Sequence, residues 1–344
     1  MIFIVFLTLV AILGYLIMPD STPLANNMTI QLSLKKPGSK FMMLRLRKTE
    51  PVDTINIFAK MLYGQPSFYR DIPITAYHFA KDSVMVDEYV GLEDKPEKKS
   101  YLIPVAKGGV PASIIHKTFW LGTDIYGRDM LSRLILGTRI SLSVGLMAVI
   151  ISMLLGVTIG SIAGYFGGWI DAALSWLMNI LWSLPALLLV IAISFALGKG
   201  LWQIFIAVGL SMWVEVARLV RGQVMSLKQV EYIEAARSLG FNNTRIISKH
   251  ILPNIVGPIL VLASSNFASA ILLEAGLSFL GFGAQPPMPT WGSMIKEHYG
   301  YIVMDAAYLA IMPGLAIMLL VYAFNLVTVG LRDAYDIKSQ STRF

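Results

Sequence analysis

The chain has 344 residues, of which 56% are hydrophobic and only 14% are charged, whereas soluble domains carry about 25% charged residues. Its formal net charge is +7 and it contains no cysteine, which excludes disulfide frameworks and thiolate metal sites. The basic residues gather in particular loops without a nucleic-acid-binding motif, so no nucleic-acid partner is expected. This composition predicts a chain whose main solvent is lipid.

The first uncharged run, residues 2–18, precedes the first basic residue, Lys35, and so lacks the positively charged start of a secretory signal peptide. We interpret it as a retained membrane helix; its marginal length leaves cleavage open as an alternative. A crossing needs about 20 apolar residues. With short extensions, five further uncharged runs bring the predicted crossings to six: residues 140–165, 172–198, 200–214, 255–273 and 306–331.

The run 200–214 is too short to cross unless its helix continues past Glu215 towards Arg218. Glu215 and Arg218 are three residues apart and share one helical face, so the two side chains can form an ion pair.

Six crossings place both termini on one side of the membrane, together with residues 218–250, which we predict to be cytoplasmic by the positive-inside rule. The opposite short loops hold Lys199 and Lys296. Arg128, Arg133 and Arg139 oppose this orientation, but they end a long exported loop, where the rule is weak. The basic residues of the cytoplasmic segment are Arg218, Arg221, Lys228, Arg237, Arg245 and Lys249.

Residues 19–118 have the composition of a soluble domain. Apolar and polar residues alternate along 30–34 and again along 42–46, on either side of a turn at 35–39, which predicts strand, turn and strand. Ile55, Phe58 and Leu62 then repeat at helical spacing. We therefore expect a small α+β domain outside the membrane.

Four glycines, Gly156, Gly160, Gly164 and Gly168, lie four residues apart and form one stripe on the second predicted crossing and its end. Small residues let membrane helices approach closely. The stripe predicts helix packing either within the chain or against another subunit.

Residues 231–254 contain a charged helical stretch, a glycine and a second helical stretch that Pro253 is expected to end. Gly240 can adopt the left-handed conformation that terminates the first helix. Asn242 or Asn243 can cap the second. The alanines leave a low surface into which another protein can press.

This segment resembles the coupling loop of binding-protein-dependent ABC permeases, in which Glu-Ala-Ala is followed by three residues, Gly, nine residues, a hydrophobe and then Leu-Pro. His250 occupies the hydrophobic position, as is common in the oligopeptide and dipeptide branch. The matching residues are Glu234, Ala235, Ala236, Gly240, Leu252 and Pro253.

The resemblance extends over roughly residues 121–336 and is greatest to the dipeptide and oligopeptide permease "C" subunit. Residues 121–139 read Leu-Gly-Thr-Asp-Ile-Tyr-Gly-Arg-Asp-Met-Leu-Ser-Arg-Leu-Ile-Leu-Gly-Thr-Arg. Three departures stand out: a basic tail before the first helix is missing, the exported loop is longer, and Glu215 replaces a small residue. Further matching segments are 164–171, 274–283, 285–287, 291–292 and 330–333.

The fold that this resemblance implies is an all-α polytopic membrane protein: a type I ABC importer permease core of six transmembrane helices, with the small α+β exported insert between helices 1 and 2. The expected division is a first transmembrane helix at 1–18, the exported insert at 19–118, an amphipathic lead-in at 119–139, the permease core at 140–331 with its coupling loop at 221–254, and a cytoplasmic tail at 332–344.

Residues 198–200, Gly-Lys-Gly, lack the other elements of a phosphate-binding loop, so ATP must bind elsewhere. The resemblance implies a heterodimer with a second permease subunit, two ABC ATPase subunits that bind ATP and Mg, and an extracytoplasmic solute-binding protein. No cofactor or metal is expected in this chain, and membrane lipid surrounds it. The expected cargo is di- or oligopeptides, with nickel or another small solute as the alternative.

Polar residues within the predicted crossings are candidates for the translocation path or gate, because a peptide backbone needs groups that replace water. The alternative role is hydrogen bonding between helices or to the backbone of the same helix. Glu274 is a separate candidate, since an acid within a span suggests function; the alternatives are a structural pair across the permease interface and a snorkelling carboxylate. The candidates are Asn179, Ser183, Ser264, Ser265, Asn266, Ser269 and Glu274.

Two other classes of protein remain as alternatives. A membrane-embedded enzyme is disfavoured because His-Glu-x-x-His and Gly-x-Ser-x-Gly motifs are missing and the four histidines are scattered. A receptor or scaffold is supported only by the long exported insert. Turnover by the chain alone would favour the enzyme, and copurification with ATPase subunits would exclude the receptor or scaffold.

Overall fold

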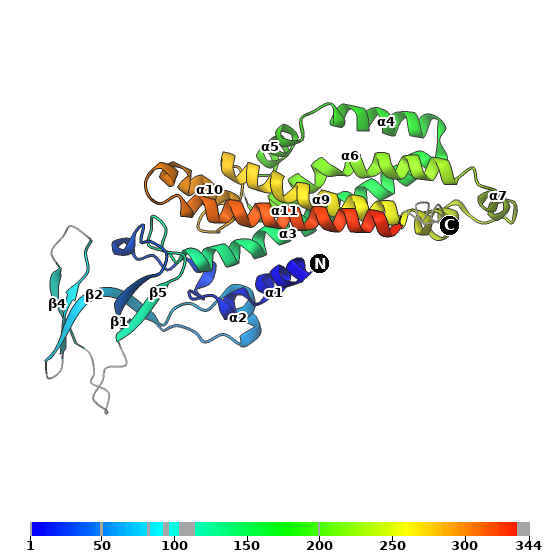
Figure 1. Ribbon diagram of the computed structural model, residues 1–344. Coiled ribbons are helices and arrows are strands. Elements are labelled where there is room, and N and C mark those ends of the chain that lie inside the picture. The colour runs from blue at the N-terminus through cyan, green and yellow to red at the C-terminus, as the bar shows by residue number, and fades with distance from the viewer. Residues whose placement is uncertain are drawn as a thin grey trace, which may run out of the picture.

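The computed structural model describes residues 2–48, 51–80, 83–91, 96–102, 114–198 and 200–335. Lys199 and residues 336–344 of the predicted tail lie outside the described residues. A β-sheet occupies one end of the molecule and the short helix α7 (Glu231–Ser238) the other, with the long helices running between them (Figure 1).

Four described helices are long and apolar enough to cross a membrane. A fifth candidate is a pair of helices bent by 96° at a short break, and the apolar helix α1 (Ile2–Ile17) is shorter. Six crossings therefore require that α1 and the bent pair each cross once, which stays a prediction. The four are α3 (Met130–Phe166), α6 (Leu201–Leu227), α9 (Val256–Leu280, with the helical turns before it) and α11 (Tyr308–Tyr335); the bent pair is α4 (Gly168–Trp182) and α5 (Ala186–Leu197).

Helix α3 begins ten residues before the predicted apolar run. Asp129 precedes it and accepts a hydrogen bond from the backbone N–H of Ser132 at 2.8 Å, as an N-cap does. Helix α6 continues past Glu215 to Leu227, which confirms the predicted extension.

The glycines of α3 bring it against α6 of the same chain. A Cβ at Gly160 would lie 2.4 Å from the carbonyl oxygen of Ala217, and Gly156 and Gly164 face α6 equally closely. Gly168 lies beyond the end of α3, and a Cβ there would meet nothing within 4 Å. The first three glycines thus support packing within the chain, and Gly168 has no part in it.

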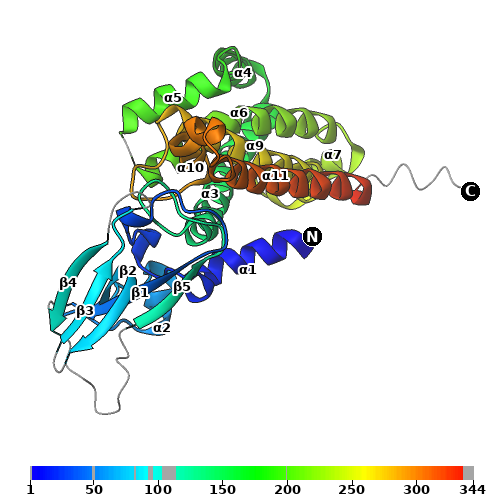
Figure 2. The ribbon, with the colours of Figure 1, turned by 60° about the vertical axis from the view of Figure 1, so that its left-hand side comes forward.

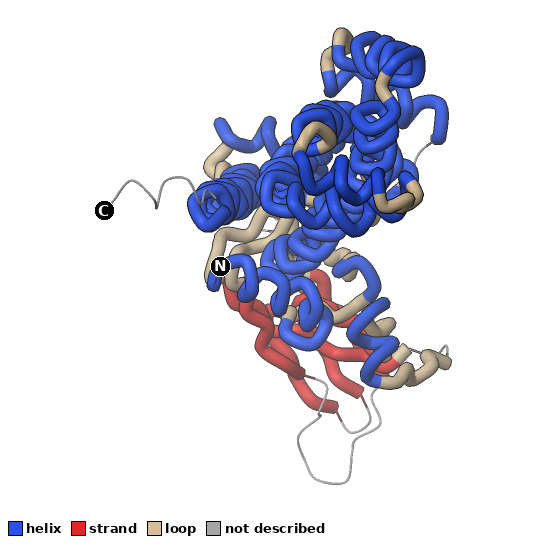
Figure 3. Tube along the Cα trace, turned by 90° about the vertical axis from the view of Figure 1, so that its right-hand side faces the viewer, coloured by secondary structure: helices blue, strands red, loops and turns tan. Residues whose placement is uncertain are grey.

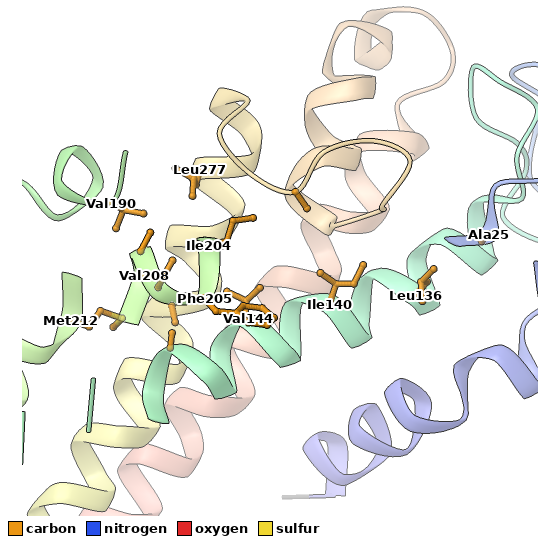
Figure 4. Packing of buried hydrophobic residues seen from close by; sticks show 14 of the residues in the cluster. Ala25, Leu136, Ile140, Val144, Val190, Ile204, Phe205, Val208, Met212 and Leu277 are labelled. Carbon is orange, nitrogen blue, oxygen red and sulfur yellow. The ribbon is translucent and has the colours of Figure 1, made fainter. Parts of the chain in front are cut away.

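The main core lies where α3, α5, α6 and α9 meet (Figure 4). Val144, Val190, Val208 and Leu277 contribute to it and are fully buried. The outer face of α11 instead exposes many large apolar side chains, as expected for helices solvated by lipid. They are Ile311, Leu315, Met318, Leu319, Tyr322, Leu326 and Val329.

The sheet has five antiparallel strands in the order β4-β3-β2-β1-β5, side by side in Figure 2. Leu44 lies opposite Ile72, and both are buried with Ile74, Val84 and Val86. Figure 3 shows the strands together in the lower part of the molecule, below the long helices. The strands are β1 (Ser39–Arg47), β2 (Tyr69–Ala80), β3 (Ser83–Glu88), β4 (Glu97–Leu102) and β5 (Ile114–Phe119).

The predicted strand at 30–34 is wrong. Ile30–Leu32 forms a 3₁₀ turn, because this segment bonds the loop before α3: the N–H of Leu34 donates to the Asp124 carbonyl at 3.1 Å. The predicted return strand is β1, and of the residues predicted at helical spacing Phe58 and Leu62 lie in α2 (Ile57–Tyr63), whereas Ile55 precedes it.

The five-stranded sheet and the loop before β1, together called the sheet domain, contact the helices near the start of α11. The Tyr308 hydroxyl donates to the carbonyl of Lys35 at 2.8 Å, and Lys36 forms an ion pair with Asp305. The sheet is therefore held at the end of the helix bundle that lies away from α7 (Figure 1).

Candidate functional site

The segment that resembles a coupling loop forms a short helix and a tight glycine turn at one end of the molecule (Figure 1). Gly240 has φ +79°, the left-handed conformation that a side chain tolerates poorly. The N–H groups of Gly240 and Phe241 donate back to the carbonyls of Arg237 and Ala236 at 2.9 and 3.2 Å. These bonds satisfy carbonyls at the end of α7, so the predicted glycine stop is confirmed.

The two faces of α7 divide the predicted coupling residues. Ile233 and Ala236 are buried in the chain's own core, whereas Glu234, Ala235 and Arg237 are exposed. Ala236 therefore packs inward, and the exposed candidates for contact with another protein are Glu234 and Ala235.

The chain does not end its helical path at Pro253, so that prediction is wrong. The Asn242 side chain caps α8 (Asn243–Arg245) by accepting from the N–H of Arg245 at 2.8 Å. A π-helical turn (Ile246–Ile251) and a 3₁₀ turn (Leu252–Ile255) then lead into α9. Pro253 lies in the first turn of the 3₁₀ segment, where a missing N–H is tolerated. The path from Asn243 to Leu280 is 38 residues long.

Tyr165 at the end of α3 contacts three of the segments around the predicted coupling loop. Its hydroxyl donates to Asn243 Oδ1 at 2.9 Å, Lys228 Nζ donates to its carbonyl at 2.9 Å, and the Arg237 guanidinium lies 5.8 Å from its ring centroid. The end of α7 is thereby connected to α3, α6 and α8.

A cleft of about 480 Å³ lies between the bent pair α4–α5 and helices α6 and α9. Apolar side chains, many of them leucines, form most of its wall, and Ser211, Glu215 and Ser269 supply polar groups. Pockets for small ligands commonly have this composition, with few polar groups among apolar ones.

The predicted pairing of Glu215 with Arg218 is wrong. Arg218 reaches towards α4, where it donates to Asn179 Oδ1 at 2.7 Å and lies 4.6 Å from the Trp182 ring centroid. Glu215 has no hydrogen-bond or ion-pair partner among the described residues. Sequence reasoning treated Glu215 only as half of an ion pair, although its departure from the small residue usual in the family was the signal.

Of the predicted path residues, only Ser269 lines this cleft. Ser183 donates to the Ile180 carbonyl at the end of α4 at 2.7 Å, and Ser265 lines a separate groove. Asn266 is buried, and Asn179 accepts a hydrogen bond from Arg218. Ser264 donates to the carbonyl of Phe324 at 3.3 Å. The structure does not bring these residues to one place.

Glu274 is buried inside the chain, with 1% of its surface exposed. It accepts a hydrogen bond from Ser278 at 2.7 Å, and Thr290 donates to the same serine hydroxyl at 3.2 Å. Glu274 is thus bonded within its own chain, which fits neither a pair across the permease interface nor a snorkelling carboxylate. Through Ser278 it is connected to the segment before α10 (Trp291–His298), and its gate role stays a prediction.

A buried charge network joins the loop before α3 to α10. Arg128 Nε donates to Asp124 at 2.6 Å and its Nη2 to Glu297 at 3.0 Å, while Arg133 lies 3.4 to 3.5 Å from the same two carboxylates. Two of the three arginines that opposed the predicted orientation, Arg128 and Arg133, are thus neutralised inside the fold. Burial lowers the pKa of His298 beside them.

This network also bears on metal binding. Asp124, Glu297 and His298 offer ligand atoms within 4.8 Å of one another. Arg128 and Arg133 already supply two positive charges to the two carboxylates. A divalent cation would add repulsion from both guanidinium groups, so these residues do not fit a metal ion.

The family described as "Binding-protein-dependent transport system inner membrane component" matches residues 156–338. The chain belongs to this family. It is 46% identical over 222 residues to the glutathione transport system permease protein GsiD of Pectobacterium atrosepticum, covering 64% of this chain and 73% of the relative.

Two dipeptide transport system permease proteins, DppC, are also similar. The protein of Alkalihalophilus pseudofirmus is 46% identical over a match that covers 64% of this chain and 73% of the relative. The protein of Bacillus subtilis is 42% identical over a match that covers 67% of this chain and 71% of the relative. A solved structure titled as inward-facing conformations of the MetNI methionine ABC transporter has TM-score 0.49 and 20% identity, covering 60% of this chain and 97% of the other. The predicted family is confirmed by the sequence matches.

Proposed function

We propose that this chain is the permease subunit of an ATP-driven importer that passes di- or oligopeptides across the cytoplasmic membrane. The observation that carries the proposal is the exposed helix α7 with its glycine turn, after which a helical path from Asn243 leads into α9 and the wall of the cleft. Relatives named for dipeptide and glutathione transport support a peptide cargo, since glutathione is itself a peptide.

Membership of the family implies a partner ATPase and a second permease. In the proposed complex this chain forms a heterodimer with that permease, two ATPase subunits bind ATP and Mg, and an extracytoplasmic solute-binding protein delivers the cargo. The chain itself contributes no catalytic group and no cofactor site.

In the proposed mechanism the ATPase presses on Glu234 and Ala235, the exposed residues of α7. Ile233 and Ala236 hold α7 in the core. Helix α7 and its glycine turn therefore move together with the ends of α3 and α6. The continuous path from Asn243 to Leu280 carries the movement to Ser269 in the cleft. Helix α7 can favour the open or the closed state of the gate only if its contacts differ between these two states.

We also propose that the sheet domain lies outside the cytoplasm and that both termini lie inside it. The sheet and α7 are at opposite ends of the helices (Figure 1), and residues 218–250 are rich in arginine and lysine. Because the chain lacks cysteine, Lys40→Cys in β1 introduces a single exposed label site. An impermeant thiol reagent should label it from outside intact cells, and labelling only after lysis would reverse the topology.

The cargo is tested with the complete complex reconstituted in vesicles with its solute-binding protein. Labelled tripeptides should accumulate when ATP is supplied, and a tenfold excess of unlabelled tripeptide, but not of nickel ions, should suppress uptake. Accumulation of nickel with no peptide uptake would establish the alternative cargo. ATP-independent turnover of peptide by this chain alone would indicate an enzyme.

A further inference from the structure

The cleft between α4–α5, α6 and α9 contains a carboxylate that the fold leaves without a counterion. Glu215 lies in the middle of α6, between its bounds Leu201–Leu227, and its side chain lines the cleft. The guanidinium one turn away, on Arg218, is held by Asn179 and Trp182 instead. No described residue donates a hydrogen bond to Glu215.

An uncompensated charge at this depth is costly, and acids in membrane spans usually face a cavity or a partner. Two other acids on these helices have partners within the chain: Asp171 at the start of α4 accepts from Arg221 at 2.6 Å, and one carboxylate oxygen of Glu274 accepts from Ser278 at 2.7 Å. Glu215 differs because the open cleft, and not another part of this chain, lies in front of it.

The remaining lining fits a small solute with one cationic group. Leu181, Leu184 and Leu272 provide apolar surface, and Ser211 and Ser269 add two hydroxyl groups. The volume of about 480 Å³ falls within the range of about 300–1,000 Å³ typical of ligand pockets. Glu215 is exposed to the cleft, and the apolar walls reduce the screening that water would otherwise give to a carboxylate–cation pair.

We propose that Glu215 binds a positively charged amino group of the cargo during translocation and so gives this permease a preference for cationic solutes. The inference rests on the proposed peptide transport. The amino group has two sources in a peptide, the α-ammonium group and a lysine side chain, and both would form the same charge-assisted hydrogen bond with the carboxylate.

The test compares peptide uptake by reconstituted complexes that contain wild-type chain, Glu215→Gln or Glu215→Asp. Asp53→Asn serves as the matched control, because it removes one exposed acid far from the cleft. One pair of cargoes is Ala-Lys-Ala and its norleucine analogue, and the other is the norleucine peptide with and without N-acetylation. The same solute-binding protein is used throughout, so its own selectivity cancels when ratios are compared between variants.

Glu215→Gln should lower the uptake ratio of the cationic to the neutral cargo about tenfold, the effect of losing one hydrogen bond to a charged group. Glu215→Asp should retain part of the preference and Asp53→Asn all of it. A fall in the lysine-to-norleucine ratio assigns the side-chain ammonium, and a fall in the free-to-acetylated ratio assigns the α-ammonium.

Unchanged ratios in Glu215→Gln would overturn the inference, even if total uptake fell. Failure of Glu215→Gln, but not of Glu215→Asp, to assemble with the second permease would also overturn it, because Glu215 would then pair with a cation of that subunit. If the wild-type complex transports no peptide, the proposed peptide transport is refuted, and the inference about Glu215, which rests on it, is refuted as well.

Discussion

Replacing Gly160 by alanine tests how closely α3 and α6 approach one another. A Cβ at this position would lie 2.4 Å from the carbonyl oxygen of Ala217 and 2.9 Å from Cβ of Val220. The first distance is about 1 Å short of ordinary van der Waals contact. Because the nearest atom belongs to backbone, the helices themselves must separate.

Gly222 on α6 is the matched control, since a Cβ there would meet nothing within 4 Å. Alanine in place of a helical glycine gains about 1 kcal/mol in helix propensity in water, and this gain is common to both variants. Forcing a group into a packed interface costs about 1–3 kcal/mol. We therefore expect Gly160→Ala to be less stable than Gly222→Ala by about 1–3 kcal/mol.

The measurement is equilibrium unfolding of the purified chain in mixed micelles, together with the yield of assembled complex. Gly160→Leu should lower the yield further, because a branched side chain holds the helices apart. Equal stability of Gly160→Ala and Gly222→Ala would refute the close approach of α3 and α6.

Three further predictions concern other parts of the chain. Gly240→Val should reduce the ATPase stimulation by loaded solute-binding protein more than Gly240→Ala, because a branched residue tolerates φ +79° poorly; equal coupling in both would exclude the turn as a contact that transmits force. Arg128→Met should destabilise the chain by about 3 kcal/mol, the lower end for breaking a buried ion pair, because Arg133 at 3.5 Å then remains the nearest counterion of buried Asp124; in thermal melting the double variant Arg128→Met/Asp124→Leu should recover part of the loss, and no recovery would count against the network. Burial opposes ionisation of Glu88, but hydrogen bonds from Lys99 and Tyr101 hold its pKa below 4.5, so its contribution is present at neutral pH and disappears as the pH falls through the lowered pKa. Hydrogen-exchange protection of β3 and β4 should differ between wild type and Glu88→Gln at pH 7 and converge in acid; a difference that persists in acid would contradict this.

The predictions that held depend on residues close together in the sequence. Long apolar runs indicated the membrane helices, and the left-handed turn at Gly240 followed from a glycine after a helical stretch. The continuation of α6 past Glu215 followed from the length that a crossing needs. Backbone propensity and hydrophobic length act locally, so the sequence by itself determined these features and the family to which the chain belongs.

The tertiary structure decided where side chains find partners. Residues 30–34 alternate like a strand, but their backbone groups bond the loop at 123–126. Ala236 is buried, because α7 packs against the ends of other helices. Arg218 donates a hydrogen bond to Asn179 of another helix and forms no ion pair with Glu215. Each outcome depends on which distant segment lies nearest, because hydrogen bonds and ion pairs form only at contact distance. The sequence spacing that places Glu215 and Arg218 on one helical face therefore could not show that the carboxylate is left facing an open cleft.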